Sequence, residues 1–178
     1  MKALYVASFS VYKRPIDAIE AMQHAPDAEL DMVGEGYLQP QMESLIKKLG
    51  LEGRVRLSPR VSEEKLAEFY SKADVFICTA EQSWGLVAID AIERDVVVIS
   101  GKETGVSEIL EDGKTGLIVP TRDPKAIAGK IQWVADHPDE SAEMATRAKE
   151  VLKDLTLEKY VAQLEKGFRQ ALEGRKAK

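Results

Sequence analysis

Two neighbouring segments of the chain join a short apolar run to a polar turn that contains glycine. The first leads from Val75–Cys78 into Glu81–Gly85, and the second leads from Val96–Ile99 into Glu103–Gly105. A helical pattern follows each turn. Backbone N–H groups at helix N-termini bind anions, and open α/β sheets place such turns side by side at the carboxyl ends of their strands. The spacing therefore predicts a nucleotide-phosphate site.

The length and composition fit one soluble globular domain. The chain has 178 residues, of which 44% are hydrophobic and 31% are charged. Its formal net charge of -5 gives no support to nucleic acid as a partner, because phosphate backbones require a basic face. No signal-peptide pattern and no run of 18 apolar residues occurs. We expect a cytoplasmic protein that reaches a membrane only through a partner or an acceptor lipid.

The residues that could hold a metal or react covalently are few. Cys78 is the single cysteine, so no intrachain disulfide can form, and its apolar surroundings predict a buried thiol. His24 and His137 lie near helix ends and share no metal-ligand spacing with Cys78. We expect no metal and no cofactor. The glycine patterns of dinucleotide-binding folds and of ATPase P-loops do not occur in the sequence.

Apolar runs alternate between strand and helix patterns as far as Pro120, and the pattern is helical afterwards. We expect strands at Leu4–Ala7, Glu29–Val33, Val55–Leu57, Val75–Cys78, Val96–Ile99 and Gly116–Val119. We expect helices at Pro15–His24, Leu38–Leu49, Leu86–Ile92, Gly105–Leu110, Glu140–Asp154 and Leu157–Leu172, with two more that begin after Ser62 and Asp123. The alternation predicts an α/β fold, a Rossmann-like doubly wound parallel sheet of about six strands in three layers. One domain should cover residues 1–173, and residues 174–178 should form a frayed basic tail.

The turn and helix at Glu81–Asp90 resemble the signature of the retaining glycosyltransferases of the GT-B fold that are called family 4. In that family a Glu, the step Gly-Phe-Gly-Leu and a second Glu open the helix. Alignment places Gln82 and Asp90 at the two Glu positions, and Trp84-Gly85-Leu86 at the aromatic-Gly-Leu step.

Further segments carry the same resemblance over nearly the whole chain. Gly105–Ile109 and Asp112–Pro120 match the next signature of the family, and Val33–Gly36 resembles its Val-Gly-Asp-Gly-Pro turn. Gly53–Leu57 and Ala73–Phe76 resemble its neighbouring strands. The resemblance covers only the carboxyl-terminal, nucleotide-sugar-binding half of those enzymes. It implies an amino-terminal acceptor-binding domain or partner chain, which this sequence does not contain.

The resemblance implies transfer of a sugar from a nucleoside diphosphate sugar, with retention and without a metal. It implies two catalytic residues, Lys13 at the diphosphate and Gln82 at the transferred sugar. The base is expected near Arg60 and Val61. The implied donor-binding residues are Ser8, Arg14, Gly34, Arg60, Val61, Glu81, Ser83, Trp84, Gly85, Leu86, Asp90, Gly105 and Glu108. Amides at the start of the Leu86 helix can meet the charge that develops on the leaving group.

Three positions depart from the family pattern. Ser8 replaces an Arg at the diphosphate, Gln82 replaces a carboxylate, and Asp90 is one methylene shorter than Glu. A positioned electrostatic donor is worth ~2.7–4 kcal/mol in catalysis, so the loss of one can leave a site that binds without turnover. Two compensations stay open: Arg14 substitutes for the missing Arg, or Glu81 takes the role of Gln82.

Several alternatives remain at this point. Glu108 either anchors the donor or caps its short helix, and Trp84 either flanks the ligand or packs in the core. The chain is either the donor half of a glycosyltransferase or a non-catalytic nucleotide-sugar-binding module. A flavodoxin-like domain with an unrelated small ligand is a third possibility. Arg54 and Arg56 flank a strand, where surface salt bridges are the plain expectation.

Overall fold

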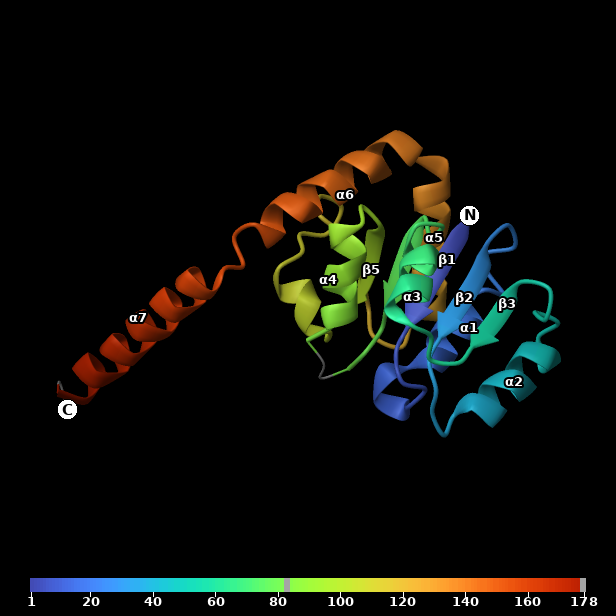
Figure 1. The fold of residues 1–178 in the computed structure, drawn as a ribbon, viewed down its shortest axis with the longest axis horizontal. Coiled ribbons are helices and arrows are strands. Elements are labelled where there is room, and N and C mark those ends of the chain that lie inside the picture. Colours follow the sequence, from blue (N-terminus) through green and yellow to red (C-terminus); the bar gives the residue numbers. More distant parts are fainter. Residues whose placement is uncertain (82–83, 177–178) are drawn as a thin grey trace.

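A parallel sheet of six strands forms the middle layer of the molecule (Figure 1). The computed structural model describes residues 1–81 and 84–176. The strands are β1 (Lys2–Val6), β2 (Glu29–Val33), β3 (Val55–Ser58), β4 (Val75–Cys78), β5 (Val97–Gly101) and β6 (Leu117–Val119). The helices are α1 (Pro15–Ala21), α2 (Gln39–Lys48), α3 (Glu63–Tyr70), α4 (Leu86–Glu93), α5 (Pro124–Asp136), α6 (Pro138–Leu152) and α7 (Leu157–Lys176), with short 3-10 helices η1 (Val11–Lys13) and η2 (Gly105–Glu108).

The strands lie in the order β3-β2-β1-β4-β5-β6, and every neighbouring pair is parallel. This order confirms the predicted Rossmann-like sheet. The chain builds outward from β1 to β3 and then returns to the centre with β4, so the direction of winding reverses between β1 and β4. Ligands of doubly wound sheets bind outside the carboxyl ends of the strands at this point.

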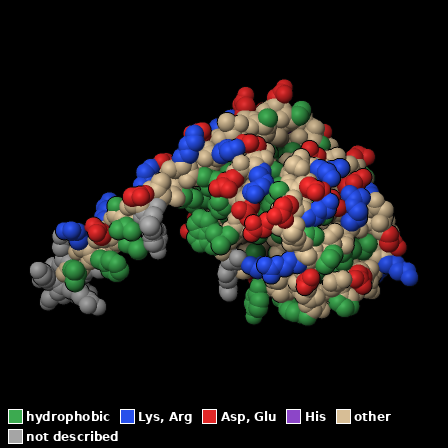
Figure 2. All heavy atoms as spheres, in the orientation of Figure 1, with side chains coloured by type: hydrophobic (Ala, Val, Ile, Leu, Met, Phe, Trp, Pro, Cys, Tyr) green, Lys and Arg blue, Asp and Glu red, His purple; other side chains and the backbone are tan. Residues whose placement is uncertain are grey.

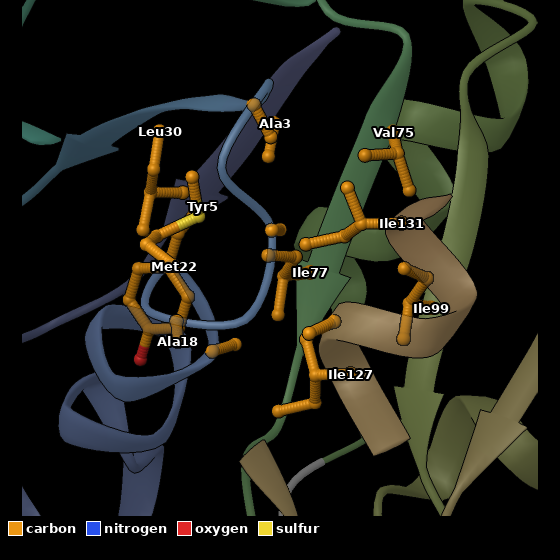
Figure 3. Packing of buried hydrophobic residues seen from close by; sticks show 14 of the residues in the cluster. Ala3, Tyr5, Ala18, Met22, Leu30, Val75, Ile77, Ile99, Ile127 and Ile131 are labelled. Carbon is orange, nitrogen blue, oxygen red and sulfur yellow. The ribbon is translucent and has the colours of Figure 1, made fainter. Parts of the chain in front are cut away.

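Helices cover both faces of the sheet, which confirms the predicted three layers. Helices α1, α2 and α5 pack on one face, and α3 and α4 pack on the other. Helix α6 contacts both α4 and α5, with Met144 and Ala145 in the first core and Ala148 in the second. Figure 3 shows the core of the first face, where Ile127 and Ile131 of α5 lie beside Val75 and Ile77 of β4 and Ile99 of β5. Each face thus has its own apolar core, and the sheet lies between them.

Strand β4 shows why its sequence is an uninterrupted apolar run. Val75 and Ile77 belong to the core on the α5 side, while Phe76 and Cys78 belong to the core on the α4 side. Successive side chains of a strand point to opposite faces. A central parallel strand with helices on both faces therefore has to be apolar at every position.

Most predicted elements are confirmed, with ends that differ by a few residues. Two predicted caps are also present, since Ser62 accepts a hydrogen bond from the amide of Lys65 and Asp123 accepts one from the amide of Ala126. The predicted short helix at Gly105–Leu110 is present but ends two residues earlier, at Glu108. It is the 3-10 helix η2, because its amides bond to carbonyls three residues back and not four.

Helix α7 projects from the body of the molecule (Figure 1). It extends three residues past the predicted domain end at residue 173, so residues 174–176 continue the helix. Val161, Leu164, Phe168 and Leu172 are exposed and recur at helical spacing, and Figure 2 shows apolar side chains along this helix. In the described part of the chain, no helix is both long and apolar enough to cross a membrane.

Arg54 stabilises the segment between α1 and β2 through hydrogen bonds, a role that the sequence did not predict. Its guanidinium donates to the carbonyl oxygens of Ala25 and Ala28 at 2.8 and 3.0 Å, and to that of Met22 at 2.9 Å. Met22 is the C-cap of α1. Arg54 thus satisfies carbonyl groups that the end of a helix leaves without partners. Arg56 instead forms the expected exposed salt bridges, with Glu29 and Asp31.

Replacement of Arg54 should therefore destabilise the fold much more than replacement of Arg56. Arg54→Met should lower the free energy of unfolding by roughly 2–3 kcal/mol, because a hydrogen bond from a charged group contributes about 1.5–3 kcal/mol. Arg56→Met removes only exposed ion pairs and should cost less than about 1 kcal/mol. Urea denaturation of both variants measures the difference, and equal losses would contradict this stabilising role.

Candidate functional site

The carboxyl ends of β1 and β4 meet at the same edge of the sheet, which faces the bottom of the view in Figure 1. Ala3 pairs with Val75 and Leu4 pairs with Phe76, so the two strands end side by side. The turn after β1 carries Ser8 and η1, and the turn after β4 leads into α4. The point at which winding reverses therefore brings the two turns together.

Two adjoining cavities open at this edge. We call the cavity beside Lys13 and the start of α4 the inner cavity, and its volume is about 460 Å³. We call the cavity beside Gly34 and Arg60 the outer cavity, and its volume is about 540 Å³. The inner cavity is lined by Tyr5, Val6, Ala7, Ser8, Lys13, Ile77, Cys78, Thr79, Ala80, Trp84, Gly85, Leu86 and Val87. The outer cavity is lined by Val6, Ala7, Ser8, Val33, Gly34, Glu35, Arg60, Val61, Glu63, Leu66 and Val87. Both cavities share the wall formed by Val6, Ala7, Ser8 and Val87.

Helix α4 begins at the inner cavity. Its N-cap residue Gly85 has a left-handed backbone conformation, with φ of 83°, and among the described residues no side chain caps the helix. A Cβ at Gly85 would lie 3.3 Å from Cγ2 of Thr104 and 3.4 Å from Sγ of Cys78, so glycine suits both the conformation and the space. Leu86 and Val87, the first helical residues, line the cavity. The positive end of the helix dipole thus lies at the cavity wall.

The turn that carries Lys13 is fixed through its backbone. The hydroxyl of Tyr5 donates to the carbonyl oxygen of Lys13 at 2.7 Å. The hydroxyl of Thr79 shares its hydrogen between the carbonyl oxygens of Lys13 and Arg14, at 3.3 and 3.2 Å. Burial raises the pKa of Tyr5 well above its ordinary value, so this phenol stays a donor. Two strand ends, those of β1 and β4, therefore hold the Lys13 turn against the inner cavity.

Cys78 lies at the end of β4 and is buried, as the sequence predicts. Burial raises its pKa to about 11. At neutral pH the side chain is therefore a protonated thiol, which is a poor nucleophile. Its contact position under Gly85 indicates a packing role.

The structure places the implied catalytic residue Lys13 and four implied donor-binding residues around the inner cavity: Ser8, Trp84, Gly85 and Leu86. It places Gly34, Arg60 and Val61 around the outer cavity, together with Ser8. Trp84 is 49% exposed, which answers the open question about its side chain: it borders the cavity and is not part of the core. Gln82 and Ser83 lie outside the described residues, so their roles stay predictions.

Arg14 and Glu81 do not line either cavity, and the structure pairs them with each other. Nη1 of Arg14 lies 3.2 Å from Oε1 of Glu81, and the same guanidinium makes two hydrogen bonds to Asp17. Glu81 also accepts a hydrogen bond from Nε of Arg122 at 3.1 Å. Hydrogen bonding to Arg122, with the nearby charges of both arginines, lowers the pKa of Glu81.

The remaining implied residues, Asp90, Gly105 and Glu108, also lie outside the linings of both cavities. Asp90 is half-buried on α4, and its carbonyl oxygen accepts a hydrogen bond from Arg94 at 2.8 Å. Gly105 begins η2, and Glu108 is exposed at its end. Their roles at a donor stay predictions.

Thr104 is the main residue of this edge that sequence reasoning missed. It is 1% exposed, and its hydroxyl donates to the carbonyl oxygen of Ala80 at 2.6 Å, with the carbonyl oxygen of Cys78 at 3.3 Å. Its side chain also packs under Gly85. The available signal was a polar residue in the turn after β5, directly before Gly105.

The fold and its two cavities define a Rossmann-like α/β domain of the type that forms the carboxyl-terminal half of GT-B glycosyltransferases. The chain belongs to the family described as Glycosyl transferases group 1, whose model matches residues 1–151. Among its curated relatives, the D-inositol 3-phosphate glycosyltransferase of Streptomyces scabiei is 34% identical over 117 residues, which cover 65% of this chain and 26% of that protein.

Solved structures agree in fold. Anabaena HepE in complex with UDP and glucose is 19% identical, with a TM-score of 0.80 over 97% of this chain and 48% of that one. The sucrose-phosphate synthase of Thermosynechococcus elongatus is 27% identical, with a TM-score of 0.81 over 97% of this chain and 46% of that one. The chain therefore spans less than half the length of these proteins.

Gly34 forms a wall of the outer cavity where no larger residue fits. A Cβ at this position would lie 1.9 Å from the carbonyl oxygen of Ala7, which is a backbone atom that cannot move aside. Gly34→Ala should therefore lower the free energy of unfolding by at least about 2–3 kcal/mol. Denaturant titration followed by circular dichroism measures this loss.

Gly129→Ala is the matched control for this variant. Gly129 lies in α5 with no heavy atom within 4 Å of its would-be Cβ. Alanine should stabilise the helix there by up to about 1 kcal/mol. A Gly34 variant as stable as the wild type would show that the close approach to Ala7 is not a constraint.

Proposed function

We propose that this chain is the donor-binding half of a retaining glycosyltransferase that uses a nucleoside diphosphate sugar. The observation that carries the proposal is the pair of adjoining cavities at the switch point of the sheet. Lys13 and the start of α4 border the inner one. A ligand with two different ends and an anionic middle fits two cavities that share one wall.

The shared wall and the start of α4 would bind the diphosphate. The amides of Leu86 and Val87 and the ammonium group of Lys13 supply positive charge there, and Ser8 supplies a hydroxyl. These groups would also stabilise the negative charge that develops as the glycosidic bond breaks. This arrangement needs no metal ion, because the protein itself supplies the opposing charge.

The two ends of the donor would then occupy different cavities. The nucleoside would lie in the outer cavity, near Arg60 and Val61 and against the open backbone of Gly34. The sugar would lie in the inner cavity beside Trp84, close to the position of Gln82 in the sequence. UDP-glucose is the first donor to test, because HepE, which shares the fold, binds UDP and glucose in its crystal structure.

An amino-terminal domain or partner chain would complete the site with an acceptor. Large apolar side chains are exposed around this edge, namely Val11, Tyr12, Tyr37, Trp84 and Leu86. Contiguous exposed apolar residues commonly mark an interaction surface. The curated relatives are named as enzymes and are more than twice as long as the part that matches, which favours a transferase over the non-catalytic module.

Replacement of Lys13 should weaken donor binding. Lys13→Met removes one charged contact to the diphosphate and should raise the dissociation constant of UDP-glucose by roughly tenfold or more. Isothermal titration calorimetry measures this dissociation constant. Lys47→Met is the control, because Lys47 lies exposed on α2 and away from both cavities, and it should bind like the wild type. If the wild type binds neither UDP, GDP, ADP nor their sugars, the proposal is wrong.

Transfer itself should require the second half of the cleft. The chain, mixed with radiolabelled UDP-glucose and the amino-terminal domain of a family member, should label an acceptor with the anomeric configuration of the donor. The chain alone should not, because half of the residues that position an acceptor are missing. Inverted product would contradict the retaining mechanism, and equal labelling without the second domain would contradict the need for a partner.

A further inference from the structure

Glu81 is tied to the turn that follows β1, although 66 or more residues separate the two segments. Its backbone amide donates to the carbonyl oxygen of Tyr12 at 2.8 Å. Its carboxylate lies 3.2 Å from Nη1 of Arg14 and 3.1 Å from Nε of Arg122. The side chain of Glu81 is only 17% exposed. Both the backbone and the side chain of this one residue therefore join the turn after β4 to the turn that carries Lys13.

Arg14 is held from the opposite side. It has a left-handed backbone conformation, with φ of 54°, between η1 and α1. Its guanidinium donates to both carboxylate oxygens of Asp17, at 2.6 and 2.7 Å, and Asp17 is 5% exposed. Its carbonyl oxygen accepts from Thr79. Arg14 is thus fixed by α1 and β4, and it offers Glu81 a rigid partner.

The charges in this cluster balance. Arg14 and Arg122 face Asp17 and Glu81, so two cations meet two carboxylates. A balanced cluster adds little positive potential at the inner cavity, and a carboxylate placed on a diphosphate would repel it. Neither Arg14 nor Glu81 lines that cavity. Direct donor contact is therefore the less favoured role for both.

We propose that Glu81 is a positioning residue of the donor site: through Arg14 it fixes the turn after β4 against the Lys13 turn. This inference rests on the proposed donor-binding function. Glu81 secures the start of the turn, and Thr104 secures Ala80 and packs under Gly85 on the other side. With both sides fixed, the start of α4 and Lys13 face the same cavity, and Trp84 is held at its edge.

The test removes the negative charge of Glu81 and keeps the size and shape of its side chain. Glu81→Gln should raise the dissociation constant of UDP-glucose by roughly tenfold, since the charge-assisted contacts of this carboxylate with Arg14 and Arg122 hold the turn in place. Glu81→Asp keeps the charge and should recover part of the affinity. Glu52→Gln removes the same charge from an exposed position between α2 and β3, away from both cavities, and it should bind like the wild type.

Tryptophan fluorescence separates positioning from a general loss of stability. The chain has two tryptophans, Trp84 and Trp133, and Trp133 stacks on His137 far along the chain in α5. In a Trp133→Phe background, Glu81→Gln should increase acrylamide quenching of Trp84 in the ligand-free protein, and Glu52→Gln should not. Circular dichroism thermal melts identify a temperature at which every variant is folded, and the quenching is measured at that temperature.

The outcomes are distinguishable. If the wild type binds UDP-glucose and Glu81→Gln binds it equally well with unchanged Trp84 quenching, the positioning role is wrong and the donor site stands. If the wild type binds no sugar nucleotide, the donor site itself is wrong and this inference fails with it.

The contribution of Arg14 needs a double variant. Arg14→Gln alone would leave Asp17 buried without its arginine partner, so Arg14→Gln/Asp17→Asn is used instead. This variant should lose affinity to the same degree as Glu81→Gln.

Discussion

The parallel pairing of β1 with β4 is the constraint on which the rest of the structure depends. Parallel strands must start at one edge of a sheet and end at the other, so their following turns meet. Because the winding reverses at this pair, no helix crosses over the gap between the two turns. A hollow edge follows from topology, and the side chains of two turns decide what it can hold.

Much of the fold could be predicted from sequence, since the signals are local. Short stretches of neighbouring residues predict a strand at Val75–Cys78 and helix starts at Ser62 and at Asp123-Pro124. All three are confirmed. The 3-10 geometry of η2 was not predictable in this way. Apolar spacing in a stretch of six residues does not distinguish a 3-10 turn from the first turns of an α-helix.

Site residues could be predicted from sequence only where they lie in a turn that directly follows a predicted strand. Lys13, Gly85 and Arg60 border cavities because each follows the end of a strand. The partners of Arg54 lie 26 or more residues away, and Glu81 pairs with Arg14 and Arg122 from two other turns, so no local pattern encodes these contacts. Arginine in particular has a long side chain with five donors, so its neighbours in sequence say little about its partners. Thr104 carried a local signal beside Gly105, but its partners Cys78 and Ala80 lie 26 and 24 residues away, so its role could not be predicted.

The wall common to both cavities consists of small side chains. Ala7 and Ser8 lie where the chain leaves β1, and Val6 and Val87 complete the boundary. A ligand that occupies both cavities lies against this shared wall, so the same four residues position both of its ends. Bulkier side chains in the wall would separate the two cavities, and each would then hold only part of such a ligand.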